Sequence, residues 1–268
     1  PLKVSEKSET PILFHDLPTN GIVYWDLGFN LHSVEQNYLP YVPLFGRALL
    51  ELGTEKEDFV TLTQRISRKT GGIHPQTFTS DVGGEERGAS WLFLRAKSML
   101  AQSRDLTAIL RDVLLTVQFD NQERFRQMVM EEKARHEQRL VPEGHQVVNL
   151  RLRAHFSEAD WVAEQMKGVS YLFFLRDLTR KVDEDWPSVL ASLEHIRQTL
   201  VSRQNMIINA TCDDKDWSEF NPHLDGFLEE LPADDVQEFK WSPEEPAGFE
   251  GMIIPTQVNY VGKGANLY

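Results

Sequence analysis

The sequence predicts an α+β domain in which a sheet and a set of helices form separate layers. Two observations predict this class. Segments that alternate apolar and polar residues stand near the beginning, after a first pair of helices, and again near residue 206, while a long middle part has apolar residues at helical spacing. The chain has 268 residues and is 41% hydrophobic, which is enough to build a sizeable core.

The first elements are two strands. Residues 12–15 and 21–31 alternate apolar and polar side chains, and the second segment includes Tyr, Trp and Phe. The sequence Thr19-Asn20-Gly21 between them predicts a turn. Residues 1–10 are polar and contain no apolar run, so they predict a disordered lead-in rather than a signal peptide.

A buried helix is predicted next, over residues 39–52. Its apolar residues recur at helical spacing, Pro40 and Pro43 fit its first turn, and Gly53 is a typical stop. The later elements follow by the same criteria. Strands are predicted over 73–80, 90–96 and 206–211, and helices over 58–69, 105–117, 120–140, 147–156, 157–166, 171–182, 187–201 and 217–231. Asp120 is predicted to cap its helix, and Pro222 to interrupt the last one.

The last part of the chain differs in composition. Residues 232–250 are acidic and rich in Pro, which is typical of a linker. Residues 251–268 return to an apolar pattern, which predicts the first strand of a following, truncated domain. The main domain therefore covers 11–231.

Charge and cysteine content limit the function. The chain has 28 Lys and Arg against 41 Asp and Glu, a net charge of −13, which argues against nucleic acid as a partner and is compatible with basic peptides. No apolar run is long enough to predict a membrane span. Cys212 is the only cysteine, which excludes a disulfide framework and predicts a buried structural thiol. The pair His136-Glu137 lacks the second His of H-E-x-x-H, so we expect a solvated helix face there.

Several segments together resemble the presequence proteases, which are zinc peptidases of the pitrilysin type. They cover nearly the whole chain after residue 10 in a consistent order. The segments are TNGIVYWDLGF (19–29), LPYVPLFGRALLELGTE (39–55), RKTGGI (68–73), EQMKGVSYLFFL (164–175) and IPTQVNYVGKGANLY (254–268). The resemblance implies a metallopeptidase-like fold with a mostly antiparallel sheet packed on one side by helices. It identifies 11–231 with the third, non-catalytic domain of four.

The resemblance also bears on the zinc site. Catalytic domains of this type carry H-x-x-E-H on the helix that corresponds to residues 39–52. If Gly53 is matched to the glycine that closes that helix, the metal positions hold Leu44, Arg47 and Ala48. None of these side chains is a ligand for zinc. The resemblance therefore implies no catalytic residue and no metal in this chain, with zinc held by a catalytic domain upstream. The substrate-binding residues stay unknown.

The function that the resemblance implies is structural. The parent protein is expected to be a zinc metalloendopeptidase, and this domain to help enclose short unfolded peptides, such as basic targeting peptides, with the remaining domains as its partners. Acidic residues of 232–250 are candidates to face those peptides. The expected location is the chloroplast stroma or mitochondrial matrix in a eukaryote, and the cytoplasm in a bacterium.

Three alternatives stay open. The chain could be an independent module that binds extended peptides on a sheet edge at residues 73–80. It could be an enzyme whose site shows no motif. It could also be related to the non-catalytic subunit of the mitochondrial processing peptidase, although that subunit has a long glycine-rich loop and the glycines here come in short pairs such as Gly71-Gly72 and Gly83-Gly84.

Overall fold

The computed structural model describes residues 2–242, 248–255 and 257–265. Its centre is a sheet with the strand order β1-β2-β6-β3-β5-β4, in which neighbours run antiparallel except for the parallel pair β2 and β6. The strands are β1 (Leu2–Lys7), β2 (Thr10–Asp16), β3 (Ile22–Asn30), β4 (Ile73–Ser80), β5 (Ala89–Met99) and β6 (Met206–Cys212). This confirms the predicted α+β class with a mostly antiparallel sheet.

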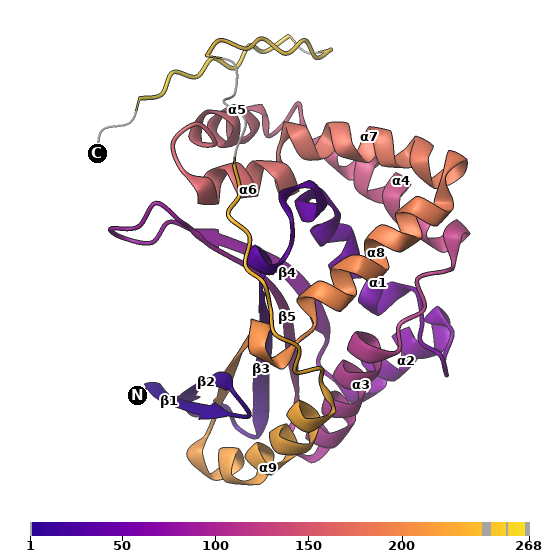
Figure 1. Ribbon diagram of the computed structural model, residues 1–268, viewed down its shortest axis with the longest axis vertical. Coiled ribbons are helices and arrows are strands. Elements are labelled where there is room, and N and C mark those ends of the chain that lie inside the picture. Colours follow the sequence, from indigo (N-terminus) through magenta and orange to yellow (C-terminus); the bar gives the residue numbers. More distant parts are fainter. Residues whose placement is uncertain (1, 243–247, 256, 266–268) are drawn as a thin grey trace.

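The helices cover one face of that sheet (Figure 1). They are α1 (Val42–Glu51), α2 (Phe59–Lys69), α3 (Ser103–Leu115), α4 (Gln122–Arg139), α5 (Gly144–Arg153), α6 (Glu158–Lys167), α7 (Val169–Glu184), α8 (Trp186–Leu200) and α9 (Asp214–Glu230). Strand β3 shows why the sheet is one-sided: Val23 and Trp25 are fully buried, whereas Tyr24 between them is exposed. Trp25 packs edge-on against Phe220 and Phe227 of α9 at ring-centroid distances of 5.4 and 5.0 Å.

Helix ends follow local chemistry. The side chains of Asp58 and Ser157 accept hydrogen bonds from the main-chain N–H groups of the first turns of α2 and α6. For α4 the cap is Asn121, one residue after the predicted Asp120. Gly53 has φ +99°, and a Cβ there would lie 2.7 Å from the main-chain oxygen of Glu57, so the turn after α1 requires glycine.

Proline decides two boundaries that the sequence pattern placed incorrectly. The predicted helix 39–52 is in fact a 3₁₀ segment, Gln36–Tyr41, which contains Pro40, followed by α1 with Pro43 in its first turn. Both prolines therefore stand where a missing N–H costs little. Pro222 does not interrupt the last helix, because α9 begins at Asp214 and continues through it to Glu230.

Both ends of the chain correct the prediction. Residues 2–7 are strand β1 rather than a disordered lead-in, because their main chain pairs with β2 from Leu2–His15 to Lys7–Thr10. At the other end, residues 251–255 and 257–265 contain no strand, although one was predicted. Ile253 and Val261 are almost fully exposed, so these apolar residues have no sheet to join within the described chain.

The segment 232–242 has no regular structure, yet it lies against the domain. Trp241 is only 3% exposed and its indole N–H donates to the main-chain oxygen of Val34 at 2.9 Å. The main-chain N–H of Phe239 donates to the oxygen of His32 at 2.7 Å. The beginning of the predicted linker is thus fixed by side chains, and residues 243–247 lie outside the described part of the chain.

Candidate functional site

Helix α1 places the three residues of the predicted metal positions in two different environments. Leu44 and Ala48 are fully buried in the hydrophobic core. The Arg47 side chain is 16% exposed and lies at the surface of α1 that faces α4. Correspondence of these positions with the metal ligands of a catalytic domain stays a prediction, but the structure shows what the side chains do here.

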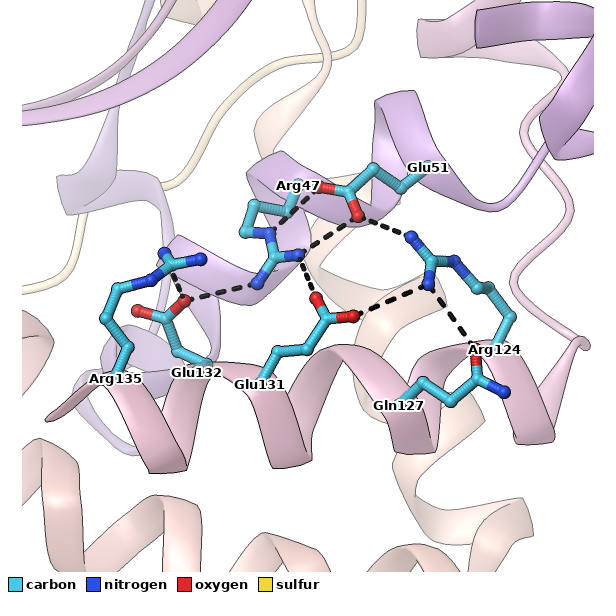
Figure 2. Close-up of polar contacts among 7 residues, drawn as sticks. All are labelled: Arg47, Glu51, Arg124, Gln127, Glu131, Glu132 and Arg135. Atoms are coloured by element: carbon cyan, nitrogen blue, oxygen red, sulfur yellow. Dashed lines mark hydrogen bonds and ion pairs between the residues drawn. The ribbon is translucent and has the colours of Figure 1, made fainter. Parts of the chain in front are cut away.

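Arg47 is the centre of an ion-pair network between α1 and α4, which Figure 2 shows. Its guanidinium binds both carboxylate oxygens of Glu51 at 2.9 and 3.0 Å. It also reaches Glu131 at 3.0 Å and Glu132 at 3.2 Å, both on α4. Arg124 closes the network by donating to Glu51 at 2.9 Å. One guanidinium therefore joins three carboxylates from two helices.

The network keeps its charges over a wide pH range. Burial alone would lower the pKa of Arg47, but Glu51, Glu131 and Glu132 together raise it above the ordinary value. Burial alone would raise the pKa of Glu132, but the hydrogen bond from His136 and the charges of Arg135 and Arg47 outweigh it and lower the pKa. The network is a fixed electrostatic cross-link between α1 and α4.

These residues do not fit zinc. Zinc requires neutral or anionic N, O or S donors that converge on one point, whereas Arg47 brings a permanent positive charge and Leu44 and Ala48 bring hydrocarbon. Within residues 2–242, 248–255 and 257–265, no group of three or more His, Cys, Asp or Glu side chains has the arrangement of a metal site.

His136 is mostly buried, which corrects the prediction of a solvated helix face at this position. Its side chain is 11% exposed, its Nε2 lies 3.3 Å from Glu132, and its ring packs edge-on against Tyr171 at 4.9 Å. Its neighbour Glu137 is partly exposed and pairs with Arg176 at 3.0 Å. His136 thus supports Glu132, which the sequence motif search could not show because the partner lies one turn back on the same helix.

A cleft of about 310 Å³ opens beside this network. Its walls are the beginning of α1, the strand β4, part of α4 and the last residue of α6. The residues that line it are Pro43, Arg47, Pro75, Gln76, Thr77, Leu92, Glu132, Arg135 and Lys167. Among the described residues, Lys167 has no ion-pair partner. Packing around it lowers its pKa by desolvation, although its side chain stays in contact with solvent.

A second polar cluster surrounds His32, which the sequence analysis did not single out. Nε2 of His32 lies 3.0 Å from Glu158 of α6, and Nδ1 lies 3.1 Å from the side-chain oxygen of Asn30. The ring stacks on Trp241 with centroids 4.1 Å apart. Burial lowers the pKa of His32, and the hydrogen bond to Glu158 offsets only part of this effect. The cluster fixes segment 232–242 to the domain.

Cys212 is buried at the end of β6, as expected for a structural thiol. Burial, together with nearby carboxylates of which Asp216 has the largest effect, raises its pKa to about 12. At neutral pH almost no thiolate is present, so Cys212 is a poor nucleophile.

The fold and this site together define a class: a metallopeptidase-type α+β domain whose helix α1 carries an arginine network. The chain belongs to the family of domains associated with subfamily C of the M16 peptidases, whose profile matches residues 1–178. Over its whole length it is 42% identical to presequence protease 1, chloroplastic/mitochondrial, of Arabidopsis thaliana, and it covers 25% of that protein. It is 26% identical to the mitochondrial presequence protease of Danio rerio over 79% of this chain and 21% of that protein. The chain spans about a quarter of the length of these relatives.

Solved structures show the same fold. The inactive domain of a peptidase M16 from Pseudomonas fluorescens superimposes with a TM-score of 0.61 at 14% identity, covering 91% of this chain and 54% of that one. A conserved protein from Enterococcus faecalis gives a TM-score of 0.61 at 15% identity, covering 90% and 56%. Of the helices in the described chain, none is both long and apolar enough to cross a bilayer. The chain is thus a non-catalytic, peptidase-associated type of domain, similar to one region of the presequence proteases.

Proposed function

We propose that this chain is a structural domain of a presequence-protease-type zinc metalloendopeptidase and forms part of a chamber that encloses short unfolded peptides. The single observation that carries the proposal is the Arg47 network. On the helix that holds zinc in a catalytic domain, a guanidinium binds three carboxylates and stabilises the contact with α4. The family match and the likeness to an M16 inactive domain support the same conclusion.

A reconstitution experiment tests the division of labour. The parent protein is produced as two polypeptides, one with this chain and one with the remaining domains, and cleavage of a labelled targeting peptide is measured for each alone and for the mixture. We expect no zinc uptake and no cleavage by this chain, and cleavage only when the upstream catalytic domain is present. Stoichiometric zinc together with peptide cleavage in this chain alone would overturn the proposal.

The substrates are proposed to be basic targeting peptides, which the acidic character of the chain favours. In segment 232–250, however, Glu238 pairs with Arg87 at 2.7 Å and Glu250 pairs with Arg151 at 2.7 Å. Asp234 and Asp235 are exposed and make no ion pair with the described residues, so they are the carboxylates left for a peptide. Replacing both with Lys in the parent should weaken turnover of basic peptides at low salt. Unchanged kinetics would count against this role.

The proposed location follows from the names of the relatives, which are chloroplastic and mitochondrial presequence proteases. We place the parent in the stroma or the matrix if it is eukaryotic, and in the cytoplasm if it is bacterial. Fractionation of the source cells with an antibody against this chain tests the assignment, since a signal outside these compartments contradicts it.

A further inference from the structure

The cleft beside α1 contains positive charge that the domain itself does not neutralise. Arg47 is saturated by three carboxylates, but Arg135 has one pair, with Glu132 at 3.0 Å, and its side chain is 57% exposed. Lys167 has no opposite charge among the described residues. Glu132 is the one carboxylate in the lining, and it is shared by Arg47, Arg135 and His136. In a chain with a net charge of −13, this cleft therefore favours an anion.

One wall of the cleft is an unpaired sheet edge. Strand β4 is the outermost strand next to β5, and its residues Pro75, Gln76 and Thr77 line the cleft. No hydrogen bond connects the outward main-chain groups of β4 to another segment of the described chain. An exposed edge of this kind can pair with an extended peptide through main-chain hydrogen bonds.

We propose that this cleft binds the C-terminal carboxylate of an extended peptide, with the carboxylate held by Lys167 and Arg135 and the peptide main chain lying along β4. The volume of about 310 Å³ is at the lower end of the range of ligand pockets, so it suits the end of a chain. The Nζ of Lys167 and the guanidinium of Arg135 supply the donors that a carboxylate needs. The proposal concerns the 268-residue chain itself and does not depend on whether the domain encloses a chamber.

The test compares peptides that differ only at the C-terminus. A fluorescein-labelled pentapeptide, Thr-Val-Thr-Val-Leu, is titrated with the 268-residue chain at low salt as the free acid and as the C-terminal amide, and binding is followed by fluorescence anisotropy. We expect the free acid to bind at least ten-fold more tightly. Equal affinity of the two forms would overturn the proposal. Equal affinity of an amidated peptide with an internal Glu would also overturn it, because the cleft would then not select a chain end.

The double variant Lys167→Met, Arg135→Gln should remove most of the difference between acid and amide. Its matched control is Lys215→Met, Arg180→Gln, which removes the same charges at exposed positions on α9 and α7, outside the cleft. A similar loss of affinity in both variants would mean that only net charge matters, and would contradict the site.

A measurement on the unmodified sequence does not depend on the folding of a variant. Lysines are reductively methylated with ¹³C, and the NMR signal of Lys167 is titrated with pH in the presence of each peptide. Desolvation holds the pKa of Lys167 below the ordinary value. The free acid should raise that pKa because a bound carboxylate favours the charged amine, and the amide should not. A pKa of Lys167 that does not respond to the free acid would overturn the proposal.

Discussion

Two clusters of this domain solve the same packing problem with different cations. Around Arg47, a guanidinium joins carboxylates of α1 and α4. Around His32, an imidazole joins Glu158 of α6 to Asn30 and stacks on Trp241 of the C-terminal segment. In both, one nitrogen-containing side chain connects elements that are distant in the sequence. Arg47 is charged at every pH at which the protein folds, whereas His32 can lose or gain its proton near neutral pH.

The difference teaches which contact can respond to pH. The lowered pKa of Glu132 stabilises the fold above about pH 4.3, the ordinary Glu pKa, and this stabilisation is lost only as the pH falls below that value. The lowered pKa of His32 stabilises the fold above about pH 6.5, and this stabilisation is lost as the pH falls through the folded pKa. Mild acid should therefore weaken the attachment of segment 232–242 before it weakens the contact between α1 and α4.

The largest effect is expected from Trp241→Ala, which removes the aromatic partner of His32. Trp241 is 3% exposed and also donates to Val34, so its loss leaves a cavity and an unpaired carbonyl. The free energy of unfolding should fall by about 3–5 kcal/mol in urea titrations. Phe249→Ala is the control, because Phe249 is fully exposed and its loss should change stability by less than about 0.5 kcal/mol. Equal effects would contradict the burial of Trp241.

Arg47→Leu should have the next largest effect. It leaves Glu51, Glu131 and Glu132 close together without their shared cation, and the site is only partly buried, so we expect a loss of about 2 kcal/mol at pH 7. The loss should shrink below about pH 4.3, where the carboxylates take up protons. Arg180→Leu, at an exposed pair with Asp177, should cost less than about 0.5 kcal/mol. A variant as stable as the original at pH 7 would show that the network is not a cross-link.

A smaller effect is expected from pH at His32. The free energy of unfolding should decline as the pH is lowered below about 6.5, because the unfolded chain then binds the proton that the buried imidazole resists. His32→Gln keeps a polar side chain without a titrating group in this range, and should flatten that part of the curve. The same decline in both proteins would assign the pH dependence to other groups, such as His195 beside Glu35.

The smallest effect is expected at Cys212. Its thiol is buried and its pKa is raised to about 12, so a thiol reagent at pH 8 should react with it only after denaturation. Rapid labelling of the folded chain, measured by absorbance, would show that β6 is open to solvent at this end.

Periodicity predicted most elements of the fold because it depends on neighbours along the chain. The stripe of α3 is an example: Leu106, Ile109 and Val113 recur at helical spacing and all are fully buried. The predictions failed where distant partners decide. Residues 2–7 are polar and exposed, and become a strand because β2 offers them a main-chain edge. Residues 257–265 have an apolar pattern, and form no strand because no such edge reaches them within the described chain.

The candidate site shows the same division. By itself, the sequence determined that helix α1 has no zinc ligands at Leu44, Arg47 and Ala48, because ligand chemistry is a property of each side chain. Only the tertiary structure decided that Arg47 meets Glu131 and Glu132, that His136 is buried beside them, and that Lys167 lies at the same cleft as Arg135. These contacts join helices more than 80 residues apart in the case of Arg47, and their charges are set by burial and distance, which no local pattern encodes.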